Sequence, residues 1–326
     1  MTPPLDGIVV ADFSELLPGP FLTQSLAELG AEVVKVERPP HGDTTRRLAP
    51  GVFTAVNRGK SSVLADLKDP EQAERARAVV ARADVLVEAY RPGVMKRLGL
   101  DYAALAPSMP RLIYVSLTGY GQTGPMALLP GHDVNYLATG GAIALSGRVG
   151  EPPAHAFGLP AADLCAANYA LAAVLAALVQ RGRTGTGQHV DVAMADCVAH
   201  WMNPRLAQFG DAGLSTLVAQ RDDALVKPGY GAFVCADGKT VTIGALEDHF
   251  WSRLCSVLDV APFDGTPFHG FAQRVASAQA INARLAEAVG RLIAAEAVSL
   301  LRSADVPVAE VVSPNDLPGH PQFAER

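Results

Sequence analysis

The fold is decided by two short apolar runs, Gly7-Ile8-Val9-Val10-Ala11-Asp12-Phe13 and Ala31-Glu32-Val33-Val34-Lys35-Val36-Glu37. Each run is rich in β-branched residues and predicts a buried strand. Between them, Pro20 suits the first turn of a helix over 21–29, which stops at Gly30. A strand, a helix and a strand within about 30 residues predict parallel strands joined by a right-handed crossover.

The same alternation continues along the first two thirds of the chain. Strands are expected at 62–66, 84–88, 112–117 and 188–193, and helices at 70–82, 99–105, 160–180 and 194–209. This order predicts an α/β fold with a doubly wound, Rossmann-like parallel sheet. A dinucleotide site is not expected, because the first loop lacks Gly-x-Gly-x-x-Gly and because Pro18 and Pro20 remove backbone donors there.

The last third of the chain does not continue the alternation of strands and helices. We expect a large domain at 1–209, a polar linker at 210–226, a small α+β domain at 227–314, and the start of a C-terminal return segment at 315–326. In the small domain, Asp237-Gly238 predicts a hairpin turn between strands, and helices are expected at 246–258 and within 277–301. A strand-like run follows at 306–312.

The composition narrows the class of protein. Of 326 residues, 49% are hydrophobic and 18% are charged, which is typical of a soluble globular protein, and a net charge of −6 argues against nucleic-acid binding. The N-terminus shows no secretory signal, and Asp163 interrupts the apolar run 161–179, so a core helix is expected there and no membrane span. Four widely spaced cysteines predict free thiols in the cytoplasm, and no metal site is expected.

Two residues could form a proton-transfer pair. His132 lies in the polar run Gly131-His132-Asp133-Val134-Asn135-Tyr136, and Asp163 lies near the start of the long helix. An imidazole and a carboxylate on opposite faces of a carbon next to a thioester carbonyl could remove and return its proton. From the residues alone, a core or capping His132 and an N-capping Asp163 remain open and are the simpler interpretation. Glu247 could likewise orient an imidazole or only stabilise a helix start.

Basic residues gather in the first half, several of them directly after predicted strands. The carboxyl end of a parallel sheet is where ligands bind, so these side chains could hold phosphates, although solvated surface charge is an equal alternative. They are Arg38, Arg46, Arg47, Arg58, Lys60, Arg91, Lys96 and Arg97.

Ordered motifs run almost from end to end and resemble the family III CoA-transferases, most closely their α-methylacyl-CoA racemase branch. They include Leu17-Pro18-Gly19-Pro20, Asn57-Arg58-Gly59-Lys60-Ser61-Ser62, Arg91-Pro92-Gly93-Val94-Met95, Gly119-Tyr120-Gly121-Gln122-Thr123-Gly124-Pro125, the run 131–136 and Arg183-Thr184-Gly185-Thr186-Gly187-Gln188. The resemblance implies a Rossmann-like large domain, a smaller domain and an interlocked homodimer.

The resemblance also implies roles for residues. Coenzyme A enters as part of an acyl-CoA substrate, with no permanently bound cofactor. Asp163 matches the carboxylate used across the family, His132 the second proton-transfer group of racemases, and Glu247 the carboxylate that supports that histidine. The positions that match CoA contacts are Arg38, Leu64, Ala65, Asp66, Leu67, Glu88, Ala89, Tyr90, Arg91, Arg97, Gly131, Asp133, Val134, Asn135 and Tyr136.

Two departures from the racemase pattern keep three functions open. Leu164-Cys165-Ala166-Ala167-Asn168 replaces a glycine run that follows the carboxylate in racemases, and the chain ends at Arg326, before the usual return to the large domain. The leading hypothesis is an acyl-CoA racemase whose enolate lies near backbone donors at the helix start. The alternatives are a CoA-transferase with Asp163 as nucleophile and a non-catalytic CoA-binding protein. The sequence does not indicate the acyl group.

Overall fold

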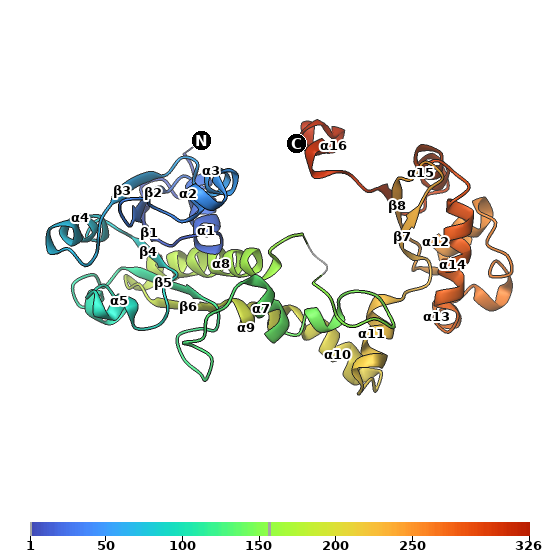
Figure 1. Cartoon of the computed structure of the whole chain (residues 1–326), viewed down its shortest axis with the longest axis horizontal. Helices are drawn as coiled ribbons and strands as arrows, with labels where there is room; N and C mark the ends of the chain where they lie inside the picture. The colour runs from blue at the N-terminus through green and yellow to red at the C-terminus, as the bar shows by residue number, and fades with distance from the viewer. Residues whose placement is uncertain (1, 156–157) are drawn as a thin grey trace. The chain divides into compact units, whose positions relative to one another are not determined.

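The computed structural model describes residues 2–155 and 158–326 and divides into two compact units (Figure 1). The first unit comprises Met1–Gly147 and Pro153–Gly213, and the second comprises Arg148–Pro152 and Leu214–Arg326. Residues 148–152 belong to the second unit, although the chain before and after them belongs to the first. No local sequence pattern predicts this.

A six-stranded parallel sheet forms the centre of the first unit, with strand order β3-β2-β1-β4-β5-β6. This is the order of a doubly wound Rossmann-like sheet, so the predicted α/β fold is confirmed. The order reverses direction between β1 and β4. The strands are β1 (Val9–Phe13), β2 (Glu32–Glu37), β3 (Ser61–Leu64), β4 (Val85–Glu88), β5 (Ile113–Thr118) and β6 (His189–Ala193).

Helices cover both faces of this sheet because side chains alternate between the faces along each strand. Val10, Val85 and Val115 face one apolar cluster, while Ala11, Leu86 and Tyr114 face the other. The first cluster takes residues from α1 (Pro18–Glu28), α7 (Asp133–Thr139), α8 (Ala161–Thr184) and α9 (Met194–Trp201). The second takes residues from α4 (Pro70–Val80), α5 (Val94–Arg97) and α6 (Tyr102–Leu105). Short helices α2 (Thr45–Leu48) and α3 (Pro50–Asn57) join β2 to β3, and α10 (Asn203–Asp211) follows α9.

The long apolar helix α8 packs into the core of the first unit. By length and composition alone its 24 residues could cross a membrane. Ala166, Ala170 and Val174 on one side of it are nonetheless buried in the cluster that covers the sheet. The structure therefore places α8 where the sequence predicts a core helix.

The second unit is a smaller α+β body. Its antiparallel sheet has the order β7-β8-β9, formed by Tyr230–Val234, Thr240–Gly244 and Val308–Glu310. Trp251, Ile281 and Leu301 are fully buried in its core. Its helices are α11 (Leu217–Leu225), α12 (Asp248–Val257), α13 (Phe271–Val275), α14 (Ala278–Val289), α15 (Ala294–Ser303) and α16 (Pro321–Ala324).

Two segments carry more structure than the sequence predicts. The expected linker 210–226 contains α11, whose start is capped because Thr216 Oγ1 accepts a hydrogen bond from the Ala219 N–H at 3.3 Å. The expected return segment 315–326 contains a 3-10 helix at Pro314–Gly319 and the short helix α16.

Candidate active site

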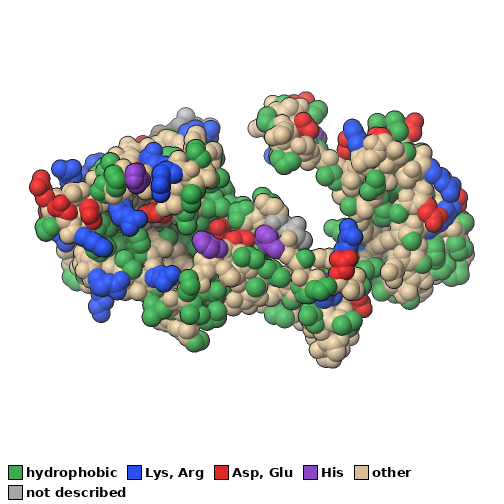
Figure 2. Space-filling model, viewed as in Figure 1, with side chains coloured by type: hydrophobic (Ala, Val, Ile, Leu, Met, Phe, Trp, Pro, Cys, Tyr) green, Lys and Arg blue, Asp and Glu red, His purple; other side chains and the backbone are tan. Residues whose placement is uncertain are grey.

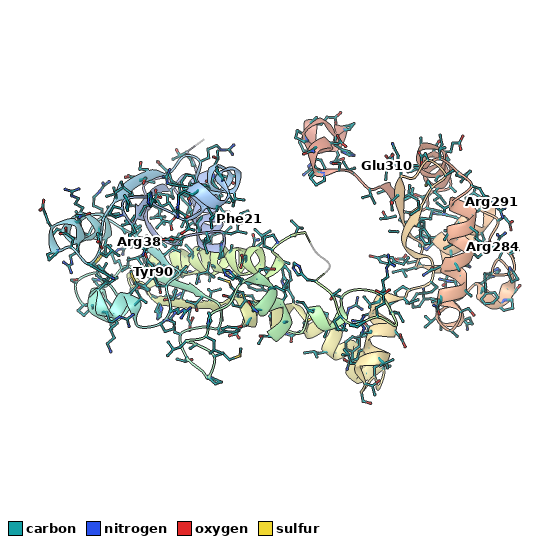
Figure 3. All side chains as sticks on the ribbon, in the orientation of Figure 1. Phe21, Arg38, Tyr90, Arg284, Arg291 and Glu310 are labelled. Atoms are coloured by element: carbon teal, nitrogen blue, oxygen red, sulfur yellow. The ribbon has the colours of Figure 1, made fainter. Side chains whose placement is uncertain are left out.

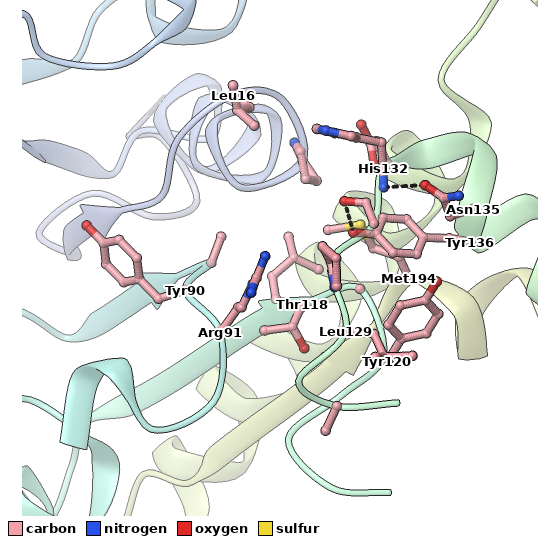
Figure 4. Close-up of a pocket in the computed structure, with 18 of the residues that line it drawn as sticks. Leu16, Tyr90, Arg91, Thr118, Tyr120, Leu129, His132, Asn135, Tyr136 and Met194 are labelled. Atoms are coloured by element: carbon pink, nitrogen blue, oxygen red, sulfur yellow. Dashed lines mark hydrogen bonds between the residues drawn. The ribbon is translucent and has the colours of Figure 1, made fainter. Parts of the chain in front are cut away.

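A cavity of about 480 Å³ lies at the carboxyl ends of the central strands. We call it the His132 cavity (Figure 4). Its walls come from the loops after β1, β4 and β5, together with the starts of α7 and α8. Ligands of open α/β sheets bind at this edge, beside the point where the strand order reverses. The lining residues are Glu15, Leu16, Pro18, Ala89, Tyr90, Arg91, Pro92, Leu117, Thr118, Gly119, Tyr120, Ala127, Leu129, Pro130, Gly131, His132, Asn135, Tyr136, Asp163 and Met194.

The cavity brings together the two residues predicted to transfer protons. His132 is exposed and stands directly before α7, where its backbone N–H donates to Asn135 Oδ1 at 3.0 Å. Asp163 is the third residue of α8 and is only partly exposed. Both side chains therefore face one space, although 30 residues separate them along the chain.

The carboxyl group of Asp163 holds its proton unusually well. Burial, together with the smaller effect of the nearby negative charge of Asp133, raises the pKa of Asp163 to about 7. Both the acid and its carboxylate are thus populated near neutral pH. A group that titrates at this pH inside a cavity is suited to proton transfer.

Asp133 caps the helix that carries Asp163. Its Oδ1 accepts hydrogen bonds from the backbone N–H of Ala162 at 2.7 Å and of Asp163 at 3.2 Å. The alternative that Asp163 itself caps α8 is therefore wrong, because Asp133 takes that role. The Leu164 N–H donates to the Pro160 carbonyl oxygen, so these three donors are already used, contrary to the expectation that they hold an enolate.

Tyr136 lines the His132 cavity together with His132. Its hydroxyl donates to the Gly131 carbonyl oxygen at 2.6 Å, and burial raises its pKa to about 12, so it stays neutral. The ring packs edge-on against Tyr120, with centroids 5.2 Å apart. A Cβ at Gly119 or Gly131 would lie 2.4 or 2.6 Å from this ring, so the motif needs glycine at both positions for close approach.

Two further cavities hold seven of the fifteen residues predicted to contact CoA. The Leu16 cavity, of about 320 Å³, shares Glu15, Leu16, Ala89 and Tyr90 with the His132 cavity. The Arg38 cavity, of about 830 Å³, shares Arg38 and Tyr90 with the Leu16 cavity. Figure 3 shows Arg38 and Tyr90 extending from neighbouring parts of the first unit. Of the predicted contacts, Arg38, Ala65, Asp66, Leu67, Tyr90 and Arg97 line the Arg38 cavity.

Other predicted CoA contacts lie elsewhere. Glu88 lines a separate cavity of about 330 Å³, and its carboxylate accepts from the Tyr90 N–H at 2.8 Å. Arg91 lines both that cavity and the His132 cavity. Leu64 and Val134 are exposed and line none of these four cavities. Their contacts with CoA stay predictions.

The basic cluster is smaller than the sequence predicts. Figure 2 shows Lys and Arg side chains gathered over the part of the first unit where Figure 1 labels α4 and α5. Lys60 is not among the available charges, because it is buried and donates to Asp12 Oδ2 at 3.2 Å. Arg46 binds both oxygens of Glu37, and Arg58 lies 3.8 Å from Glu28. The phosphate-binding interpretation is therefore wrong for Lys60, whereas for Arg46, whose side chain is 40% exposed, it stays a prediction.

Glu247 lies in the second unit. It stands directly before α12, is exposed, and makes no capping hydrogen bond through its side chain. Its position at the helix start agrees with the interpretation of Glu247 as charge that the helix dipole favours, and its support of His132 stays a prediction.

Several lining residues were not anticipated. Glu15 and Leu16 follow β1, while Thr118 ends β5 and Tyr120 comes shortly after it. Their position after parallel strands is the signal that could have identified them, because the carboxyl edge of the sheet was already predicted to bind ligand. Met194, at the start of α9 after β6, obeys the same rule.

Comparison with known proteins places this geometry among CoA enzymes. The chain is 36% identical to the acetyl-CoA:oxalate CoA-transferase of Acetobacter aceti, over 99% of this chain and 84% of that protein. It is 37% identical to human alpha-methylacyl-CoA racemase, over 77% of this chain and 63% of that protein. A solved CAIB/BAIF family protein from Brucella suis superposes with a TM-score of 0.87 at 32% identity, covering 100% of this chain and 88% of that one.

The sequence profile of CoA-transferase family III matches residues 5–326, almost the whole chain. The relatives are CoA-transferases and an acyl-CoA racemase, so the chain is an enzyme of this group. The protein belongs to CoA-transferase family III.

Proposed function

We propose that the protein is an acyl-CoA racemase that acts on 2-methylacyl-CoA thioesters. The observation that carries this proposal is that His132 and Asp163 line one cavity, while the pKa of Asp163 lies at about 7. A pair of this kind can exchange the proton on the carbon next to the thioester carbonyl.

The reaction needs two proton transfers. One group, as base, removes the α-proton and leaves an enolate, and the other, as acid, returns a proton to the opposite face. In the reverse direction the roles exchange. Asp163 suits both roles because its carboxyl group is about half ionised near pH 7. The N-terminal end of α8 adds a positive helix dipole next to the developing oxyanion, even though Asp133 occupies its first N–H groups.

The CoA part of the substrate would occupy the Leu16 and Arg38 cavities. They join the His132 cavity through shared lining residues, of which Tyr90 lines all three. Arg38, Lys68 and Arg97 give the Arg38 cavity a positive lining that suits phosphate groups, whereas Arg77 is paired with Glu74 at 2.7 Å. An interlocked homodimer follows from the family resemblance and a cytoplasmic location from the four free cysteines, and light scattering on the purified protein tests whether it is a dimer.

A second candidate is a CoA-transferase, favoured by the several relatives that carry this name. Here the Asp163 carboxylate attacks the thioester carbonyl, the carbon–sulfur bond breaks, and CoA thiolate leaves an acyl-aspartyl anhydride. The thiolate then attacks the aspartyl carbonyl, and the acyl group leaves as a carboxylate. The acceptor carboxylate next displaces CoA thiolate from the aspartyl thioester and forms a second anhydride. The thiolate then attacks the acceptor's carbonyl carbon, which gives the new acyl-CoA and releases the Asp163 carboxylate.

One experiment separates these functions. A 2-methylacyl-CoA is incubated with the protein in deuterated water, with and without an acceptor carboxylic acid, and the products are analysed by mass spectrometry. Racemisation predicts deuterium at the α-carbon, which His132→Asn and Asp163→Asn should each reduce at least 100-fold. Transfer predicts loss of turnover in Asp163→Asn only. His320→Asn, outside the cavity, is the matched control. Binding of free CoA with neither reaction would identify a non-catalytic CoA-binding protein.

A further inference from the structure

Four charged side chains are buried together beneath the loop that follows β1. Asp12, Lys35 and Asp43 are each at most 1% exposed, and Lys60 closes the group. Lys35 Nζ lies 3.0 Å from Asp43 Oδ2 and 3.9 Å from Asp12 Oδ2, and Lys60 Nζ lies 3.2 Å from Asp12 Oδ2. We call these four residues the charged cluster. Each buried charge faces an opposite one, as charges in a protein interior require.

The charged cluster makes hydrogen bonds to the backbone of the loop at Ser14 and at Leu16. Asp12 Oδ1 accepts from the Ser14 N–H at 2.9 Å, and Lys35 Nζ donates to the Ser14 carbonyl oxygen at 2.6 Å. Asp43 Oδ1 accepts from the Leu16 N–H at 3.3 Å. The same oxygen accepts from the Thr45 N–H at 2.9 Å, which ties the loop after β1 to the segment after β2.

Leu16 has an unfavourable backbone conformation at the point where the cluster holds it. Its φ angle is +69°, in the left-handed region that residues with a Cβ seldom adopt. Such a conformation persists only where the surrounding contacts impose it, and it is frequent at binding sites. The Leu16 side chain is 40% exposed and lines both the His132 and the Leu16 cavities, so core packing does not account for its conformation.

We propose that Asp43, paired with Lys35, is a positioning residue of the active site that holds Leu16 in its left-handed conformation and so shapes the wall between the His132 and Leu16 cavities. The proposal rests on the proposed function in one respect, which is the identity of the ligand. The group that contacts Leu16 would be the pantetheine part of an acyl-CoA, the segment that links the thioester to the nucleotide. Asp43 contacts neither His132 nor Asp163 and acts only through the loop.

The test is Asp43→Asn, which keeps the shape and an oxygen acceptor but removes the charge that fixes the carboxylate against Lys35. The matched control is Asp84→Asn. Asp84 lies directly before β4, binds Arg181 at 2.9 Å and accepts from the Val9 N–H at the amino end of β1 at 3.0 Å, at the opposite edge of the same sheet. Free CoA binding is measured by calorimetry, and exchange of the Leu16 amide hydrogen is measured by mass spectrometry.

We expect Asp43→Asn to weaken CoA binding about tenfold and to speed exchange at Leu16. Asp84→Asn should lower the melting temperature and leave CoA binding within twofold of wild type. Unchanged CoA affinity in Asp43→Asn, or an equal loss in both variants, would overturn the proposal. If wild-type protein binds no CoA, the proposed function fails instead, and the exchange at Leu16 still reports whether Asp43 holds the loop.

A second pair of variants covers the case that Asp43→Asn does not fold. Leu16→Ala and Leu16→Gly change an exposed position, so both should fold. Glycine at position 16 has more backbone freedom than alanine. If Asp43 imposes the backbone conformation of this residue, that extra freedom has no effect, and the two variants should bind CoA within threefold of each other. A tenfold weaker affinity of Leu16→Gly than of Leu16→Ala would show that Asp43 does not hold the loop.

Discussion

Asp133 and Asp163 are joined by a hydrogen bond from the Asp163 N–H to Asp133 Oδ1, at 3.2 Å. The contact connects the residue that follows His132 to the residue predicted to be its chemical partner. It thereby fixes the start of α7 against the start of α8. The same carboxylate raises the pKa of Asp163, which is already raised by burial. Asp133 is therefore both a helix cap and an electrostatic neighbour of the site.

Asp133→Asn should separate these two effects. The amide keeps an oxygen acceptor for the Ala162 and Asp163 N–H groups but loses the negative charge. The pKa of Asp163 should fall, so the acidic limb of the pH profile of kcat/KM should move to lower pH. Asp133→Ala should also lose the cap and about 0.5–2 kcal/mol of unfolding free energy. An unmoved acidic limb in Asp133→Asn would contradict the role of this charge.

The raised pKa of Asp163 predicts a specific dependence of stability on pH. Because the folded chain binds this proton more tightly than the unfolded chain, the stabilisation is fully present below pH 3.8 and is lost as the pH rises through about 7. Asp163→Asn has no carboxyl group at this position to ionise, so its stability does not fall in this way as the pH rises. The variant should therefore be more stable than wild type at pH 8, on the order of 2 kcal/mol, with a smaller difference at pH 5. Urea unfolding at both pH values measures it, and an equal difference at both would contradict the assignment.

The sheet could be predicted because each strand carries its own local signal. Val9, Val33, Val85 and Val115 lie in short apolar runs between turn residues, and each run is a strand of the parallel sheet. Short helices were harder, since α5 spans only Val94–Arg97 and four residues show no helical period. The predicted helix 194–209 is two helices, and Pro204 at the start of α10 was the missed signal.

The candidate site could be predicted in part. The family resemblance indicated His132 and Asp163, and the rule for parallel sheets indicated the edge at which they lie. The contact of Asp133 with α8 joins residues about 30 positions apart, and that of Asp43 with Leu16 joins residues 27 apart. Such pairs have no local pattern, because each side chain could equally cap its own segment. Burial of Lys60 was missed for the same reason.

The residues that replace the glycine run of racemases should not obstruct the substrate. Cys165, Ala166 and Ala167 are each at most 1% exposed and belong to the core cluster, and they do not line the His132 cavity. Ala166→Gly should therefore lower the unfolding free energy by about 1 kcal/mol or more, without raising the rate of α-proton exchange. Ala172→Gly, at an exposed position of the same helix, is the control for helix propensity alone. Faster exchange in Ala166→Gly would show that the side chains of this run do restrict the site.

Arg38 should be the strongest single determinant of CoA affinity on the first unit. It is exposed and lines the Leu16 and Arg38 cavities, so its guanidinium can reach a phosphate of a nucleotide bound there. Loss of a hydrogen bond to a charged group predicts that Arg38→Ala raises KM for the acyl-CoA about 10- to 100-fold. The value of kcat should change less than threefold, because the residue lies outside the His132 cavity.

Arg82→Ala is the matched control for Arg38→Ala. Arg82 pairs with Glu32 on the surface at 3.2 Å, so its loss removes the same charge from the chain without touching a cavity. If Arg38 binds the 3′-phosphate, Arg38→Ala and wild type should bind dephospho-CoA with equal affinity. If Arg38 binds the pyrophosphate instead, Arg38→Ala should lower the affinity for CoA and for dephospho-CoA by the same factor. Calorimetry with the two ligands distinguishes these contacts. Equal affinity of Arg38→Ala and Arg82→Ala for CoA itself would remove Arg38 from the binding site.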